Sequence, residues 1–230
     1  MPSPHWIHSA ATRWACTGVA LAAAACAPLS PKPAKTSEAP PVAAACPPAL
    51  AALARCLAGQ DSAGAYYLIA MPHQWNGHLV LHAHGGPALG APRPERSAAD
   101  LERWAIMVKA GYAWAGSTFR QGGVEVRAAA EDTERLRQIF VGHVAQPRRT
   151  ILHGQSWGAS VAARGAEMFT STTQGQRPYD AVLLTSGVLA GGSRSYDFRT
   201  DLRVVYQYLC NNHPRPTEVQ YPLNIGLPAD

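Results

Sequence analysis

Residues 150–169 place a strand-like run, a glycine-flanked serine and a helix-like run in direct succession. Thr150 to His153 favours a strand, and Trp157 to Phe169 favours a helix. Between them stands Gly154-Gln155-Ser156-Trp157-Gly158, a G-x-S-x-G pentapeptide. In that context the serine sits on a sharp turn, and the glycines remove side chains that would collide where strand and helix crowd together. We therefore expect the hydroxyl at the carboxyl edge of a sheet and at a helix N-terminus, where N–H groups favour negative charge.

Strand-like and helix-like segments alternate over the rest of residues 66–210. The strand-like runs are 66–70, 79–84, 112–117 and 180–188, and the helix-like runs are 97–110, 128–144 and 197–210. This order predicts an α/β fold with a doubly wound, mostly parallel sheet and helices on both faces. An Asn76-Gly77 turn between the first two strands predicts that they form a hairpin.

A second motif follows the strand-like run 79–84. Its residues are His84-Gly85-Gly86-Pro87, a loop in which glycine lets the main chain approach a ligand closely. Together with the pentapeptide, this loop resembles the His-Gly-Gly segment of the α/β-hydrolase superfamily, in the same order along the chain. The resemblance covers about Tyr66 to Val188.

The resemblance implies an enzyme, a hydrolase that acts on a small ester or peptide substrate without a cofactor. Ser156 is then the nucleophile that forms an acyl-enzyme. Gly85 belongs to the oxyanion loop, and the backbone N–H groups of Gly86 and Trp157 bind the oxyanion.

The superfamily also places an acid and then a histidine after the serine. Past Ser156 the chain carries a single histidine, His213, and Asp201 stands on the helix-like run 197–210. In one interpretation Asp201 and His213 complete an irregular triad. In the other, which the lack of further strand-like runs favours, the chain is truncated: the C-terminal strands, the acid and the histidine are encoded beyond Asp230, and 189–230 begins a cap or lid.

Two alternative functions stay open. The motifs resemble those of the proline iminopeptidases, HGGPG and GGSWG, but Ala88 and Gln155 stand where that family has glycine. The chain is in that case an aminopeptidase. The third reading is a non-catalytic surface lipoprotein that binds a ligand with a hydrolase fold.

The N-terminal region predicts export. Residues 1–25 read as a signal peptide, with Arg13 before a short Ala-rich apolar stretch, and the residues up to Cys26 resemble a lipobox, which implies lipid attachment at Cys26 and anchoring to a bacterial membrane. Plain cleavage, giving a periplasmic or secreted soluble protein, is the alternative. Residues 26–48, rich in Pro and Ala, predict a tether, and 49–188 the folded core.

The other cysteines fit an exported protein. Cys46 and Cys56 bracket an apolar stretch, Leu50 to Leu57, with helical spacing, and an oxidising compartment predicts a disulfide between them. Cys210 has no obvious partner.

The patterns of charge and of histidines argue against a nucleic-acid-binding protein and against a metal-binding protein. The net charge is +5 with a pI near 9.1, but the arginines are scattered, and nucleic-acid binding needs a concentrated basic stripe. His82 and His84 share a strand face without a third ligand at metal spacing, so we expect no metal site. Arg120 follows a strand at the expected site edge, and we expect it to pair structurally rather than with substrate.

Overall fold

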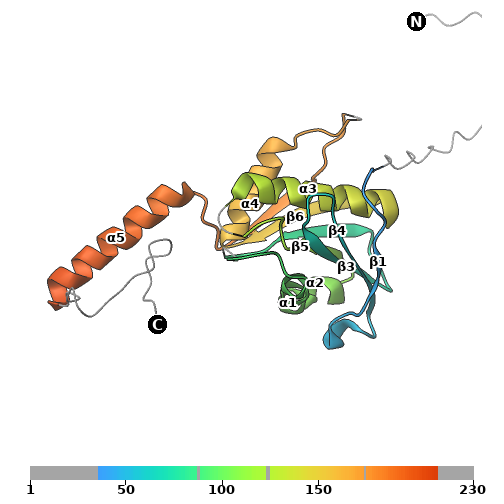
Figure 1. Ribbon diagram of the computed structural model, residues 1–230, viewed down its shortest axis with the longest axis horizontal. Coiled ribbons are helices and arrows are strands. Elements are labelled where there is room, and N and C mark those ends of the chain that lie inside the picture. The colour runs from blue at the N-terminus through green and yellow to red at the C-terminus, as the bar shows by residue number, and fades with distance from the viewer. Residues whose placement is uncertain (1–35, 87–88, 123–124, 174, 212–230) are drawn as a thin grey trace, which may run out of the picture. The chain divides into compact units, whose positions relative to one another are not determined.

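The computed structural model describes residues 36–86, 89–122, 125–173 and 175–211 (Figure 1). They belong to one unit of the chain, Pro33–Asp230, and the other unit, Met1–Lys32, lies outside them. The strands are β1 (Val42–Ala44), β2 (Ala54–Gln60), β3 (Tyr66–Pro72), β4 (His78–Ala83), β5 (Ala113–Ser117), β6 (Arg149–Gln155) and β7 (Ala181–Thr185). The helices are η1 (Pro48–Leu50), α1 (Glu95–Arg103), α2 (Ala105–Lys109), α3 (Val126–His143), α4 (Trp157–Met168) and α5 (Gly191–Cys210).

The described strands form one sheet in the order β1-β2-β3-β5-β4-β6-β7. β4 pairs in parallel with β5 and β6, and β6 pairs in parallel with β7. β3 runs antiparallel to both β5 and β2, and β1 runs antiparallel to β2. All of these strands except β1 and β3 therefore point the same way, which confirms the predicted α/β fold with a mixed, mostly parallel sheet.

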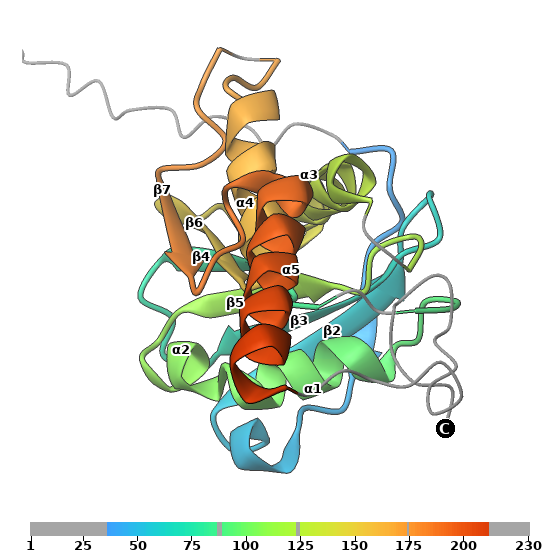
Figure 2. The ribbon, with the colours of Figure 1, turned by 90° about the vertical axis from the view of Figure 1, so that its left-hand side faces the viewer.

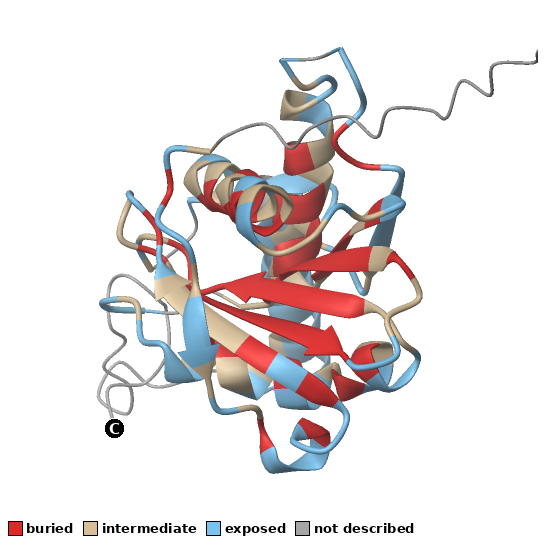
Figure 3. Ribbon diagram, turned by 90° about the vertical axis from the view of Figure 1, so that its right-hand side faces the viewer, coloured by how far each residue is buried: buried red, intermediate tan, exposed pale blue. Residues whose placement is uncertain are grey.

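Helices cover both faces of the sheet, with α3 and α4 on one side and α1 and α2 on the other (Figure 2). Under α3 and α4, the core includes Leu79, Leu81, Leu136, Ile139 and Phe140. The opposite face packs Val80, Leu101, Val108 and Trp114. β4 and β5 are buried along almost their whole length, as expected for inner strands covered on both faces (Figure 3).

Three local predictions are wrong. β3 and β4 flank the Asn76-Gly77 turn but do not pair, because β5 lies between them in the sheet. The stretch Leu50 to Leu57 is not a helix: it contains the end of η1 and the start of β2, whose backbone pairs with β3. The helix expected over 97–110 is two helices, α1 and α2, with a break at Trp104.

The segment predicted as a tether is ordered in its last part. Val42–Ala44 forms β1, with Ala44 opposite Cys56. Upstream, the Glu38 carboxylate accepts from the Ser62 N–H at 2.8 Å and lies 3.4 Å from Arg135 Nε. Backbone pairing and charge thus fix a stretch whose side chains bury little apolar surface, and the folded part begins before residue 49.

The disulfide between Cys46 and Cys56 is present, as predicted, and joins the segment after β1 to β2. Among the described residues, Cys210 is a free, exposed thiol. Within the same described ranges, no helix combines the length and the apolar character needed to span a bilayer. Cys26 and residues 1–25 lie outside the described residues, so export and lipid attachment stay predictions.

Candidate active site

Ser156 occupies a sharp turn between β6 and α4. Its backbone angles, φ 54° and ψ −119°, lie in a region that residues with a side chain rarely adopt. Its N–H donates to the Thr185 carbonyl at 2.9 Å, and its carbonyl accepts from Ala159 at 3.1 Å. β6 lies between β4 and β7, so the half-buried Ser156 stands at the carboxyl edge of the parallel strands and at the N-terminus of α4.

The glycines around Ser156 are required by backbone crowding. A Cβ on Gly154 would overlap the carbonyl of Gly158, and a Cβ on Gly158 would overlap the carbonyls of Ala83 and His84. The backbone on the two sides of the turn is therefore in close contact, and the turn also contacts the backbone at the end of β4. This is the strand–turn–helix geometry that the pentapeptide predicts.

The glycine loop after β4 lies directly against this turn. A Cβ built on Gly85 would stand 2.7 Å from the Gln155 carbonyl oxygen and 3.4 Å from Ser156 Cβ. Gly86 has a φ of +73°, which glycine adopts without strain. The structure thus brings the two predicted motifs together.

Two backbone N–H groups at this junction remain available. In the described part of the chain, the structure gives no acceptor to the N–H of Gly86 or of Trp157. Trp157 is the first residue of α4, whose dipole adds partial positive charge at that end. A small pocket adjoins both groups and is lined by His84, Gly86, Phe119, Gln121, Gly122, Glu125, Ala129 and Trp157. Free N–H donors of two residues that line one pocket suit stabilisation of a negative oxygen.

Three histidines are buried behind the site. The rings of His82 and His153 are joined through their Nδ1 atoms at 2.8 Å, and His82 stacks on Trp114. Burial lowers the pKa of His82 well below its usual range, with the neighbouring His153 as a further cause, and lowers the pKa of His153 to about 4. Both rings are therefore neutral at pH 7 and act in packing.

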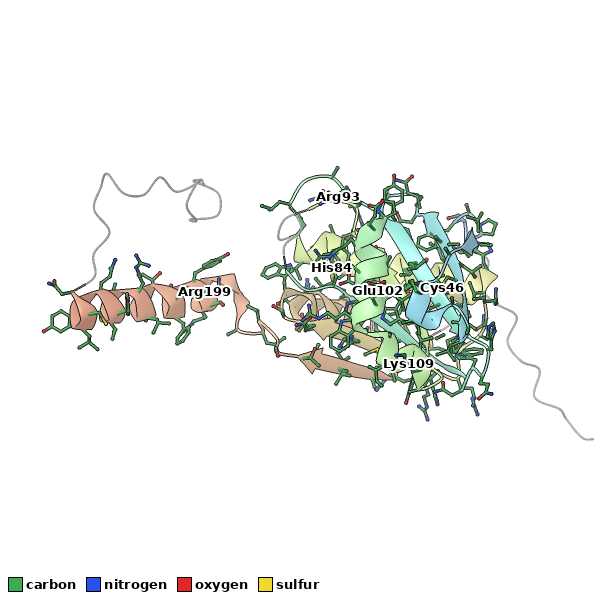
Figure 4. The ribbon with its side chains drawn as sticks, turned by 90° about the horizontal axis from the view of Figure 1, so that it is seen from below. Cys46, His84, Arg93, Glu102, Lys109 and Arg199 are labelled. Atoms are coloured by element: carbon green, nitrogen blue, oxygen red, sulfur yellow. A yellow bond between two sulfur atoms is a disulfide. The ribbon has the colours of Figure 1, made fainter. Side chains whose placement is uncertain are left out.

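His84 lies beside α1, the helix that carries Glu102 (Figure 4). Its ring stacks on Phe119 with centroids 4.2 Å apart. Burial, together with the charge of Arg96, lowers the pKa of His84 to about 4. Within the described ranges, no three His, Cys, Asp or Glu side chains gather as metal ligands.

Arg120 has the structural role expected of it. Its guanidinium contacts Asp132 at 2.6 Å and Glu131 at 3.0 Å, and its N–H donates to Asp132 at 2.7 Å. The hydrogen bond to Asp132 is the main reason that the pKa of Arg120 is raised. These pairs fasten the loop after β5 to α3.

The predicted acid and histidine are not brought to Ser156 within the described residues. Asp201 is exposed on α5, and His213 lies outside the described part of the chain, so their roles stay predictions. Asp180 stands at the start of β7, where it pairs with Arg149 at 3.0 Å, at the sheet edge away from Ser156.

Two contributors to the site were not found from the sequence. Phe119, with a φ of 61°, stacks on His84, and Arg96 of α1 donates to the Gly85 carbonyl at 2.6 Å. Arg96 is ten residues beyond Gly86 in the chain, and no motif marks it. Only the packing of α1 against the sheet brings it to the loop.

Comparisons with known proteins give a limited likeness. No family model matches the chain, and no curated protein does. Among solved structures, an esterase of the bacterial hormone-sensitive lipase family is 18% identical with a TM-score of 0.47. The match covers 71% of this chain and 58% of the esterase chain. An inhibited esterase B from Lactobacillus rhamnosis is 17% identical with a TM-score of 0.45, covering 64% and 52%. The rice cell wall degrading esterase LipA from Xanthomonas oryzae is 15% identical with a TM-score of 0.36, covering 57% and 40%.

The chain thus matches about half the length of those esterases.

Proposed function

We propose that this chain is a serine hydrolase of the α/β-hydrolase type that cleaves an ester or a related acyl bond through Ser156. One juxtaposition carries the proposal. Ser156 has a left-handed φ at the start of α4, and Gly85 lies so close that a Cβ built on it would stand 3.4 Å from Ser156 Cβ. Gly86 and Trp157, the residues after Gly85 and Ser156, have N–H groups without acceptors in the described residues and line one small pocket, which supports a role for them in binding the oxyanion.

The reaction follows from this arrangement. Ser156 Oγ attacks the substrate carbonyl carbon, and the carbonyl electron pair moves onto oxygen, within reach of the N–H groups of Gly86 and Trp157. Each such donor contributes about 3 kcal/mol in the transition state. Collapse breaks the bond to the alcohol, which takes up a proton, and water then releases the acid from Ser156. The Ser156 proton passes to a general base and from that base to the leaving alcohol, and His213 and Asp201 are the candidates that the sequence offers for the base and its carboxylate partner.

A fluorophosphonate probe tests the proposal, since it reacts with an activated serine hydroxyl. We expect covalent labelling at Ser156, identified by mass spectrometry of the labelled peptide, and turnover of a short-chain nitrophenyl ester. Ser156→Ala abolishes both. Ser160→Ala is the matched control, because Ser160 lies one turn along α4 and its hydroxyl donates to the Val188 carbonyl. An unlabelled wild-type chain would contradict the proposal.

A second candidate is a ligand-binding protein without catalysis. It is favoured by the finding that no histidine or carboxylate of the described residues hydrogen-bonds to Ser156. The same labelling experiment decides between the two, since a binding protein leaves Ser156 unmodified while its pocket still takes up a ligand.

The type of acyl bond is tested separately. Proline-naphthylamide and a short-chain nitrophenyl ester distinguish an iminopeptidase from an esterase. Ala88 and Gln155, at positions where iminopeptidases carry glycine, favour the ester. Faster turnover of the naphthylamide would reverse that choice.

A further inference from the structure

Arg96 connects α1 to the glycine loop. Its Nη2 donates to the Gly85 carbonyl oxygen at 2.6 Å and lies 3.4 Å from His84 Nδ1. On its other side, Nε lies 3.7 Å from the Asp100 carboxylate, one helical turn along α1. The guanidinium is thus held between a carboxylate and the carbonyl of a loop that touches Ser156.

This contact sets the direction of the next N–H. The described residues contain no cis peptide bond, and a trans peptide is planar, so a carbonyl and the following N–H point in opposite directions. With the Gly85 carbonyl turned toward Arg96, the N–H of Gly86 points away from Arg96. A cation on the carbonyl also polarises the peptide, which makes its N–H a stronger donor.

The peptide needs such a restraint because of its sequence. It joins two glycines, and Gly86 has a φ of +73°. Without Cβ atoms on either side, rotation of the whole peptide meets little steric resistance. A rotated peptide would present its carbonyl oxygen, and not its N–H, to a negatively charged oxygen, and the interaction would become repulsive.

We propose that Arg96 is a positioning residue that holds the Gly85–Gly86 peptide so that the Gly86 N–H faces the developing oxyanion at Ser156. This inference rests on the proposed hydrolase function. Arg96 touches neither the reacting atoms nor the hydroxyl of Ser156, and acts through the peptide.

Kinetics of the full chain test the proposal with Arg96→Ala, Arg96→Lys and a control, Arg103→Ala, which removes an exposed arginine from the same helix. Loss of a transition-state donor lowers kcat and leaves KM nearly unchanged. We expect Arg96→Ala to lower kcat about 10- to 100-fold, somewhat less than outright loss of a donor. Lysine, which keeps a cationic donor, restores part of kcat, and the control matches wild type. An unchanged kcat, or a rise in KM alone, overturns the proposal.

A measurement of peptide orientation separates this inference from the proposed function. Glycine labelled with ¹³C at the carbonyl and with ¹⁵N gives a filtered amide signal only at the second member of a Gly-Gly pair, of which the sequence has three: Gly85-Gly86, Gly122-Gly123 and Gly191-Gly192. We expect the N–H residual dipolar coupling of Gly86 to change in Arg96→Ala and not in Arg103→Ala, while the other two signals stay unchanged.

If Arg96→Ala leaves the Gly86 coupling unchanged, Arg96 does not position the peptide, whatever the activity of the chain. If the coupling changes in a chain whose wild type shows no turnover and no labelling of Ser156, the proposed function fails, and with it the oxyanion role, although Arg96 does orient the peptide.

Discussion

At position 156 a serine is held in a conformation that costs free energy. A left-handed φ at a residue with a side chain costs on the order of 1–3 kcal/mol, and it persists only where the surroundings enforce it. Here the surroundings are the backbone contacts at Gly154 and Gly158, together with the hydrogen bond from the Ser156 N–H to Thr185. The backbone strain is therefore located at Ser156, the residue whose hydroxyl the proposed reaction uses.

Two substitutions that both remove the hydroxyl measure this strain. Ser156→Gly relieves it and Ser156→Ala keeps it, so we expect the glycine variant to be more stable by about 1–2 kcal/mol. Urea unfolding of both variants followed by circular dichroism gives the difference. Equal unfolding free energies would show that the turn is not strained.

The buried histidines make stability depend on pH. His84 and His153 have a pKa of about 4 in the folded chain against 6.5 for an unperturbed histidine, and that of His82 is also lowered. The unfolded chain therefore binds more protons between pH 6.5 and pH 4, so the stability is fully present above pH 6.5 and is lost as the pH falls toward 4. Asp100, whose pKa burial raises to about 6, acts in the opposite sense but is one group against three.

We expect the free energy of unfolding to fall by on the order of 4 kcal/mol between pH 7 and pH 4. Denaturant titrations at several pH values measure it. His84→Asn removes one of the three contributions and makes this dependence shallower, and His73→Asn, at an exposed position, is the control variant. A His84 variant with the pH dependence of wild type would contradict the assignment.

Helices and strands are predicted best from the sequence where their hydrophobic pattern is local and does not depend on which strands pair. β6, α4 and α3 lie within a few residues of their predicted bounds, because buried runs and helical periodicity are local signals. The predicted hairpin of β3 and β4 is wrong because β5 lies between these strands in the sheet, and nothing in the sequence of the turn that joins them indicates this. β1 was missed because it is held by backbone pairing to β2 and buries little of its own surface.

The candidate site likewise contains residues that the sequence motifs predict and one residue, Arg96, that they do not. Ser156, Gly85, Gly86 and Trp157 come together as predicted because two motifs end neighbouring parallel strands, β4 and β6. Arg96 could not be predicted, since its contact with Gly85 depends on how α1 packs.

The disulfide stabilises the edge of the sheet formed by β1 and β2. It links residues separated by 10 positions, and closure of a loop of that length contributes about 3 kcal/mol in the chain-entropy model. We expect Cys46→Ala/Cys56→Ala to lower the free energy of unfolding by about 2–3 kcal/mol, measured by urea titration. Cys210→Ser, which removes an exposed free thiol, has no such effect. Equal stability of the double variant and wild type would show that the bridge does not contribute.

For the whole molecule, export and anchoring remain predictions that rest on the sequence before residue 36. If Cys26 is acylated, the chain fractionates with membranes in a bacterial host that processes lipoproteins. We expect Cys26→Ser to move it to the soluble periplasmic fraction, and Cys210→Ser to leave it with the membranes, as followed by immunoblotting. A wild-type chain found in the soluble fraction would favour plain signal cleavage.

The close main-chain contacts at Gly85, Gly154 and Gly158 also bear on engineering. Any larger residue there forces two backbones apart. Libraries that aim at a new selectivity should therefore hold these glycines constant. The positions to vary are Gln121 and Glu125, which line the pocket and are exposed. A new side chain there can change the shape of the pocket without moving Ser156.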